Sequence, residues 1–233
     1  MNTVIPLWTP PAVPVAGSDA VFPVRRIFCV GRNYADHARE MGHDPTREPP
    51  FFFTKPADAV VYARNAAGEV VVRYPLLTAN LHHEVELVVA LQSGGENLSA
   101  ASALSAVYGY AVGLDLTRRD IQSRAKENGH PWDMGKGFDQ SAPMSPIVPA
   151  AVCGHPAAGA ITLTVNGDLR QSGDLSQMSW SVAEVIAELS RYVALAAGDL
   201  IFTGTPAGVG PTVRGDRLDA SVAGVADLSV RMA

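Results

Sequence analysis

This 233-residue sequence lacks the features that would place a protein in a membrane or outside the cell. No apolar run approaches the roughly 18 residues that a membrane-spanning helix requires, and the proline-rich start lacks the basic and apolar regions of a secretory signal peptide. Cysteine is also scarce, because Cys29 and Cys153 form no CxxC motif and are too few for a disulfide framework. We therefore expect a cytoplasmic protein with reduced thiols and no membrane partner.

The sequence has no excess of positive charge. Its 18 lysine and arginine residues stand against 23 aspartate and glutamate residues, which gives a formal net charge of −5. Nucleic acids and anionic membrane surfaces attract basic proteins, so we expect neither as a partner. A small-molecule ligand that carries negative charge must instead be attracted by a local group of cations.

The common nucleophile and nucleotide motifs are missing as well. There is no Gly-x-Ser-x-Gly sequence, and neither cysteine has a histidine-rich context. One glycine-rich stretch, residues 203–211, follows an apolar run, but it matches neither the P-loop nor the dinucleotide-binding fingerprint. Such a loop still lets backbone N–H groups approach an anion, and the hydroxyl of Thr205 adds a donor. Water is therefore the better candidate for a nucleophile than a side chain.

Length and apolar content predict one sizeable core. With 47% hydrophobic residues, the chain is expected to form an N-terminal arm at residues 1–23, laid over the body or over a partner subunit, and a single domain at residues 24–233. Helical patterns cover residues 33–42, 101–106 and 181–196, with Asn33 as N-cap of the first and a Ser181–Glu184 capping box at the last. Strand-like runs lie at residues 26–30, 51–54, 70–72, 83–91, 108–116, 161–165, 200–203 and 228–232. This balance predicts a strand-rich α+β fold.

Two glutamates interrupt a run that otherwise predicts a buried strand, residues 81–91. Alternation along a strand places Glu84 and Glu86 on one face, and Val85, Leu87 and Val89 on the other. An ionised carboxylate taken out of water without a partner costs several kcal/mol or more, and two neighbouring carboxylates also repel each other. Either a cation compensates these charges, or their face is wet.

A third acid, Asp115, ends another apolar run. Three oxygen ligands without sulfur suit Mg²⁺ or Mn²⁺, with Ca²⁺ next and water in the remaining positions. His82 shares the parity of the glutamates, so a mixed histidine and carboxylate site for zinc or iron is an alternative of lower rank. The residues alone leave a further alternative of similar weight, in which Glu84 and Glu86 pair with arginine or lysine across a sheet.

The polar, glycine-punctuated segment 118–139 could supply such cations. Lys136 lies between two glycines, which leave space around it, and a lysine beside acidic strands can stabilise an enolate or oxyanion. For Arg124 and Lys126 we expect a solvated face.

His37 and Glu40 are three residues apart on an expected helix and would share one face. A glutamate that accepts from one imidazole nitrogen leaves the other nitrogen free to take a proton from water. An ordinary helix-surface pair is the default alternative for any His-x-x-Glu sequence.

Together these segments resemble the fumarylacetoacetate hydrolase family, in particular its small single-domain acylpyruvase branch. Six blocks in the family's order carry the resemblance: residues 30–37 (VGRNYADH), 53–56 (FTKP), 82–87 (HHEVEL), 113–117 (GLDLT), 136–139 (KGFD) and 203–210 (TGTPAGVG). It implies a mixed β-sandwich roll with few short helices, and a homodimer. Residues 22–61 also resemble bacterial members that hydrolyse fumarylpyruvate in gentisate degradation.

The resemblance also assigns roles. Glu84, Glu86 and Asp115 would hold the divalent metal; His37 and Glu40 would activate water; and Lys136 would stabilise developing negative charge. Lys55, Arg119, Gln122 and Thr205 would line the substrate. Larger members carry a fourth metal carboxylate upstream of the catalytic histidine, but residues 30–34 contain no acid here, so we expect three.

The implied reaction cleaves the C3–C4 bond of a 2,4-dioxo acid, with fumarylpyruvate giving fumarate and pyruvate. The distal carboxylate of that substrate needs a cation, for which Arg32, Arg39, Arg47 and Arg118 are candidates. The alternatives are decarboxylation of oxaloacetate, or isomerisation or decarboxylation of an aromatic-catabolic intermediate, on the same scaffold. A binding protein without catalysis is disfavoured, because every catalytic role has a residue to fill it.

Overall fold

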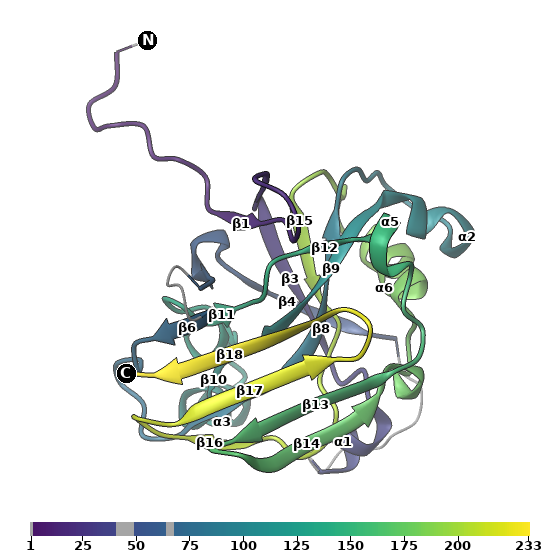
Figure 1. Ribbon diagram of the computed structural model, residues 1–233. Helices are drawn as coiled ribbons and strands as arrows, with labels where there is room; N and C mark the ends of the chain where they lie inside the picture. The colour runs from purple at the N-terminus through teal and green to yellow at the C-terminus, as the bar shows by residue number, and fades with distance from the viewer. Residues whose placement is uncertain (1, 41–48, 64–67) are drawn as a thin grey trace.

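Two large β-sheets pack against each other in the computed structural model, which describes residues 2–40, 49–63 and 68–233. Figure 1 shows the five-stranded sheet in front and the strands of the six-stranded sheet crossing behind it. The six-stranded sheet has the order β12 (Val148–Pro149), β9 (Val107–Leu114), β8 (Val85–Leu91), β15 (Asp199–Phe202), β3 (Arg26–Gly31) and β4 (Phe51–Lys55). The five-stranded sheet has the order β14 (Asp168–Asp174), β13 (Ala160–Val165), β17 (Arg217–Val222), β18 (Ala226–Met232) and β6 (Glu69–Val72).

Both sheets are mixed. β15 runs parallel to β3, and β18 runs parallel to β6, whereas the other neighbours in the two sheets are antiparallel. A smaller three-stranded sheet has the order β10 (Thr117–Arg118), β7 (Leu81–His83) and β16 (Gly210–Thr212). A two-stranded sheet pairs β11 (Ala142–Pro143) with β5 (Val60–Val61). With its few short helices, the chain has the expected α+β fold.

The main core lies between the two large sheets. β8 is buried along its whole length, and its Val85, Leu87 and Val89 enter the cluster shared with the five-stranded sheet. The opposite face of β8 contributes Val88 and Ala90 to a second cluster. The apolar partners expected on the far side of the two glutamates are therefore confirmed, and a strand covered on both faces explains the nearly continuous apolar run.

A short N-terminal hairpin covers the second cluster. It is formed by β1 (Ala12–Pro14) and β2 (Val21–Pro23), and its residues Val13 and Phe22 are buried against the six-stranded sheet. Residues 2–10 are exposed and extend away from the body (Figure 1). Part of the expected arm therefore lies over the body, and its first residues do not.

The described helices are short. They are α1 (Ala35–Glu40), α2 (Ala100–Ala103), α3 (Arg119–Glu127), α4 (Asp133–Lys136), α5 (Ala150–Cys153) and α6 (Val182–Leu189), with single 3₁₀ turns at Ala57–Ala59, Leu104–Ala106 and Leu175–Gln177. In the part of the chain that the structure describes, no helix is long and apolar enough to cross a membrane.

Some expectations about local structure are wrong. The predicted strand 83–91 is interrupted at Glu84, so that β7 and β8 belong to different sheets. Asn33 does not cap α1, since its side-chain amide binds the backbone of Trp180 and Thr203. The last helix has the expected capping box but ends at Leu189 instead of residue 196. Its C-cap is Ser190, whose hydroxyl donates to Ala187 O and accepts from Leu98 N.

Candidate active site

Three buried carboxylates converge where the six-stranded sheet meets the β7 segment. Glu84 fills the break between β7 and β8, Glu86 lies on β8, and Asp115 follows the end of β9. Because β8 and β9 pair with Glu86 opposite Gly113, the three acids become neighbours. One carboxylate oxygen from each lies within 4.8 Å of the others, and the residues are 5%, 2% and 1% exposed. This all-oxygen set is of a size and chemistry that suit one hard divalent cation.

Three cations surround two of these acids. Lys136 Nζ lies 2.6 Å from Asp115 Oδ2 and 2.8 Å from Glu84 Oε2. Lys55 Nζ lies 2.8 Å from Asp115 Oδ1, and Arg119 Nη2 pairs with Glu84 Oε1. The ion-pairing alternative is thus partly realised, since Glu84 and Asp115 have cationic partners.

Glu86 differs from the other two acids. Its Oε2 accepts a hydrogen bond from the backbone N–H of Gly204 at 2.7 Å, but no lysine or arginine of the described residues forms an ion pair with it. Burial, and then the charges of Asp115 and Glu84, raise the pKa of Glu86 well above its usual value. A buried carboxylate in this position calls for a further positive charge.

The hydrogen bond to Glu86 requires a glycine at position 204, in the glycine-rich stretch 203–211. Its φ is +100°, and a Cβ there would lie 2.7 Å from the Cβ of Asn33. Only glycine adopts this backbone conformation without cost and fits this space, so only glycine brings its N–H to Glu86.

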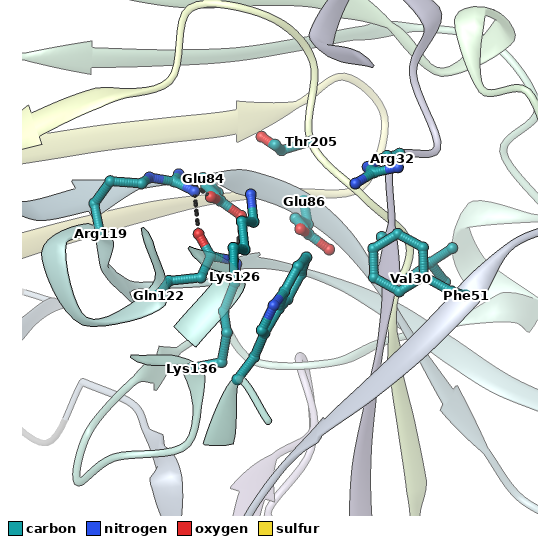
Figure 2. A pocket seen from close by; sticks show the side chains of 12 residues that line it. Val30, Arg32, Phe51, Glu84, Glu86, Arg119, Gln122, Lys126, Lys136 and Thr205 are labelled. Carbon is teal, nitrogen blue, oxygen red and sulfur yellow. Dashed lines mark hydrogen bonds and ion pairs between the residues drawn. The ribbon is translucent and has the colours of Figure 1, made fainter. Parts of the chain in front are cut away.

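Glu84 and Glu86 face a small, partly open cleft. Figure 2 shows Arg119, Gln122 and Lys136 on one side of the carboxylates, Arg32 and Phe51 on the other, and Thr205 at a third edge. The cleft is lined by Val30, Gly31, Arg32, Phe51, Glu84, Glu86, Arg119, Gln122, Lys126, Trp132, Lys136 and Thr205. Several cations thus border one small polar cavity.

Lys136 is fully enclosed between acids. Burial by itself would lower the pKa of its ammonium, but Asp115 and Glu84 together raise that pKa above the ordinary lysine value. Lys136 is therefore a fixed positive charge at neutral pH and a donor rather than a proton acceptor.

The structure brings most of the sequence-predicted substrate residues to this cleft. Arg119 Nη1 donates to Gln122 Oε1 at 2.6 Å, and both side chains line the cavity together with Thr205. Lys55 lies behind Asp115, where its Nζ donates to Leu116 O at 3.1 Å and to Lys136 O. His37 and Glu40 belong to α1, but their side chains lie outside the described part of the structure.

His82 is not part of the carboxylate cluster. Its Nδ1 accepts from Arg119 Nε at 3.4 Å, and its Nε2 lies 2.9 Å from Asn80 Oδ1. Burial, and then the charge of Arg119, lower the pKa of His82 to about 4. The ring is neutral at pH 7 and orients Arg119. The all-oxygen metal site is favoured over the mixed histidine site because His82 lies outside the cluster and its Nδ1 accepts from Arg119.

The sequence analysis did not predict two features of the cleft. Trp132 forms part of the wall, with its ring centroid 5.3 Å from that of Phe51. Lys126 is exposed as expected, yet its ammonium lies 4.9 Å from the Trp132 ring and borders the cavity. The expected polar segment folds into α3 and α4, and one turn of α3 carries both Gln122 and Lys126 to the cleft. The sequence signal for this placement is weak, because α3 carries few apolar residues and buries Arg119 and Gln122 beside Ala125.

The fold and the site define a β-rich protein with a carboxylate cluster for a divalent metal at the base of a basic cleft. Residues 26–233 match the family described as "Fumarylacetoacetate (FAA) hydrolase C-terminal". The chain belongs to the fumarylacetoacetate hydrolase family.

Three relatives span most of the chain. The crystal structure of fumarylpyruvate hydrolase from Pseudomonas aeruginosa in complex with Mn²⁺ and pyruvate is 52% identical, covers 99% of each chain and superposes with a TM-score of 0.96. The fumarylpyruvate hydrolase of Ralstonia sp is 43% identical over 187 residues, 80% of this chain and 94% of that protein. The mitochondrial oxaloacetate tautomerase of Mus musculus is 43% identical over 208 residues, 89% of this chain and 91% of that protein.

Proposed function

We propose that this protein is a metal-dependent hydrolase that cleaves the C–C bond of a 2,4-dioxo acid, with fumarylpyruvate and water giving fumarate and pyruvate. The observation that carries the proposal is the convergence of three buried carboxylates within 4.8 Å of one another, two of which line a cleft bordered by cations. Relatives named fumarylpyruvate hydrolase, one of them with Mn²⁺ and pyruvate bound, support this choice of substrate.

Glu84, Glu86 and Asp115 would hold Mg²⁺ or Mn²⁺. The unpaired charge of buried Glu86 supports this assignment, because a divalent cation supplies what the neighbouring lysines do not. When bound, the metal would act as a Lewis acid toward the oxygens of the 2-oxo acid.

Charge counting supports an anionic substrate. With a divalent metal bound, Glu84, Glu86 and Asp115 would carry three negative charges, and the adjoining Lys55, Lys136 and Arg119 would carry three positive charges. A divalent cation would leave the site with an excess of about two positive charges, before Lys126 and Arg32 at the cavity wall are counted. A dianion such as fumarylpyruvate would neutralise that excess.

The protein's own groups divide the reaction between them. His37, oriented by Glu40, would take a proton from water as the water oxygen attacks C4 of the substrate. The C3–C4 bond then breaks, its electron pair moves into the pyruvate part as an enolate, and protonation at C3 completes pyruvate. Lys136, held protonated between two acids, would stabilise the negative charge that develops on oxygen.

Arg32 would bind the distal carboxylate. Of the four candidate arginines, Arg39 pairs with Asp36 on the exposed surface of α1, and the guanidinium of Arg118 lies 4.3 Å from the Phe138 ring. Arg47 lies outside the described residues. Arg32 lines the cleft, and its backbone has a φ of +60°, a left-handed conformation that is uncommon for a residue other than glycine.

Replacing Arg32 with glutamine should raise the KM for fumarylpyruvate about tenfold or more, since a charge-assisted hydrogen bond contributes about 1.5–3 kcal/mol. Acetylpyruvate has a methyl group in place of the distal arm, so its kcat/KM should change less than about threefold. Steady-state kinetics with both substrates measure the difference, and Arg39→Gln is the matched control. An equal loss with both substrates would contradict a distal-carboxylate role.

A second candidate function is interconversion of the keto and enol forms of oxaloacetate. It is favoured by relatives named oxaloacetate tautomerase, from Mus musculus and Escherichia coli, at 43% and 40% identity. Tautomerisation and the related decarboxylation need a stabilised enolate and a proton donor but no attacking water. The His37–Glu40 pair is therefore required by the hydrolase and not by these reactions.

A substrate panel tests the choice. Purified protein with Mn²⁺ or Mg²⁺ would be assayed on fumarylpyruvate, acetylpyruvate, fumarylacetoacetate and oxaloacetate, by loss of the dioxo chromophore and by product analysis. We expect the highest kcat/KM with fumarylpyruvate and equimolar fumarate and pyruvate. Rapid oxaloacetate tautomerisation without C–C cleavage of any dioxo acid would replace this proposal with the second candidate.

Three wider expectations belong with the proposal. The protein would act as a homodimer, in the cytoplasm, and in gentisate-type degradation of aromatic compounds. The exposed residues 2–10 are available to contact a partner subunit, which supports the first of these expectations.

A further inference from the structure

Gln171 is neither a proposed metal ligand nor a proposed substrate contact. Its side chain nevertheless connects two segments that carry such residues. It projects from β14, the edge strand of the five-stranded sheet, and is fully buried. Its Oε1 lies 3.1 Å from Val85 N and 3.0 Å from His83 Nδ1. Val85 separates the two glutamates of the carboxylate cluster.

The other end of the same amide reaches the glycine-rich loop. Gln171 Nε2 donates to Thr205 Oγ1 at 2.7 Å and to Pro206 O at 2.9 Å. The amide cannot be turned over, because Pro206 O only accepts and Val85 N–H only donates. All four hydrogen-bonding positions of the amide are thus occupied, each by a group of matching kind.

This fixed orientation determines what Thr205 can do. The Nε2 of Gln171 has no lone pair to offer, so the Thr205 oxygen must be the acceptor in their contact. The Thr205 hydrogen remains for another acceptor, and no acceptor within the described residues takes it. Since Thr205 lines the cleft, the hydroxyl is prepared to donate to a bound anion (Figure 2).

The backbone around Gln171 is shaped to deliver this contact. The pairing of β13 with β14 places Leu163 opposite Gln171 and Thr164 opposite Leu169, so Arg170 is an extra residue in a β-bulge. Such a bulge bends a strand and re-aims the neighbouring side chain. The Gly-rich loop packs directly on the bulge, because a Cβ at Gly208 would lie 2.0 Å from Arg170 O.

We propose that Gln171 is a positioning residue that holds the Thr205 hydroxyl as a hydrogen-bond donor to the carboxylate of the 2-oxo acid. The inference rests on the proposed function, in which Thr205 contacts the substrate. Gln171 itself touches no substrate atom, and it acts by accepting from Val85 and His83 while donating to Thr205 and Pro206. A fold-stabilising glutamine alone would not couple to the Thr205 hydroxyl.

A double-mutant cycle with pyruvate as the probe tests this role. In the presence of saturating Mn²⁺, Thr205→Val should raise the Kd of pyruvate about tenfold, the cost of one hydrogen bond to a charged group. Gln171→Glu keeps the two accepting contacts but turns the Thr205 hydroxyl toward itself, so it should cause a similar loss. In the Thr205→Val background, Gln171→Glu should add less than about a twofold loss.

Other results distinguish a failure of the positioning role of Gln171 from a failure of the proposed function. If Thr205→Val binds pyruvate as wild type does, then Thr205 does not hold the substrate, and the role of Gln171 falls with it. A different result would overturn the positioning role while the proposed function stands. In that result Thr205→Val weakens pyruvate binding, but Gln171→Glu either leaves the Kd unchanged or raises it by the same factor in the wild-type and Thr205→Val backgrounds. Gln171→Met serves as an uncharged second variant, and Mn²⁺ affinity without pyruvate detects any change in the metal site.

Wild-type protein supplies a measurement that needs no Gln171 variant. With Mg²⁺ as a diamagnetic metal, the side-chain amide protons of Gln171 should exchange slowly with solvent, and their NMR signals should shift when pyruvate is added. The shift should vanish in Thr205→Val. A Gln171 amide signal that ignores pyruvate in the wild-type protein would overturn the inference even if no Gln171 variant folds.

Discussion

Replacement of Glu86 by glutamine is expected to abolish tight Mn²⁺ binding and to lower turnover of fumarylpyruvate about 10³-fold. Lewis-acid stabilisation of developing charge contributes several kcal/mol, and each 1.36 kcal/mol of barrier changes the rate tenfold. Removal of all divalent metal by chelation should have at least as large an effect, reversed when Mn²⁺ is restored. Steady-state assays and calorimetric titration with Mn²⁺ measure the two losses.

The unfolding temperature of the same variant distinguishes a metal ligand from a structural ion pair. Burial and the neighbouring acids already disfavour the charged form of Glu86. Without metal, the Glu86→Gln variant should therefore unfold at the same temperature as the wild-type protein or at a higher one, because glutamine is neutral. Adding Mn²⁺ should stabilise wild type and the exposed control Glu96→Gln, but not Glu86→Gln. A marked loss of stability in metal-free Glu86→Gln, with Mn²⁺ binding intact, would contradict the assignment.

Replacement of His37 by alanine should lower hydrolysis of fumarylpyruvate by 10²–10⁴-fold, the usual contribution of a general base. Mn²⁺ and pyruvate should bind as in wild type, because neither depends on this side chain in the proposal. Reactions of oxaloacetate that need only a stabilised enolate should persist. Glu40→Gln should give a smaller loss of hydrolysis, since the histidine remains but is no longer oriented.

Two comparisons make the His37 result decisive. Asp36→Asn changes an exposed carboxylate on the same helix, one that pairs with Arg39, and should leave hydrolysis within about twofold of wild type. Hydrolysis that survives in His37→Ala would show that another group activates the water. Equal loss of hydrolysis and of oxaloacetate chemistry would mean that His37 serves enolate formation instead.

The carboxylate cluster shows what the local sequence pattern can predict and what it cannot. Alternation in residues 81–91 identified Glu84 and Glu86 as charges in an apolar run, and both do face the cleft. The pattern did not predict the break at Glu84, where the flanking backbone is hydrogen-bonded to the Gln171 side chain at 3.1 Å and to the Asp115 backbone at 2.9 Å. These partners come from other segments of the chain, so no window of sequence around Glu84 contains them.

Polar segments were the hardest to place. β14 and β17 were not among the predicted strands. β14 has almost no apolar residues, whereas β17 does alternate, with Leu218, Ala220 and Val222 buried, but it is short and rich in small or polar residues. No helix was predicted in the polar segment that forms α3, yet α3 buries Arg119, Gln122 and Ala125. The burial of Arg119 is stabilised by an ion pair with Glu84 and a hydrogen bond to His82, and such partners cannot be inferred from the helical periodicity of apolar residues.

By itself, the sequence determined the class of fold, the three acids of the carboxylate cluster and the family, because these follow from the order and spacing of residues along the chain. The tertiary structure decided which charges are paired: Lys136 and Arg119 take Glu84, while Glu86 is left for a further cation. It also placed Arg32 at the cleft and brought Gln171 to Thr205, 34 positions away. Burial and pairing depend on distances between segments remote in sequence, and only the packing of the two sheets sets those distances.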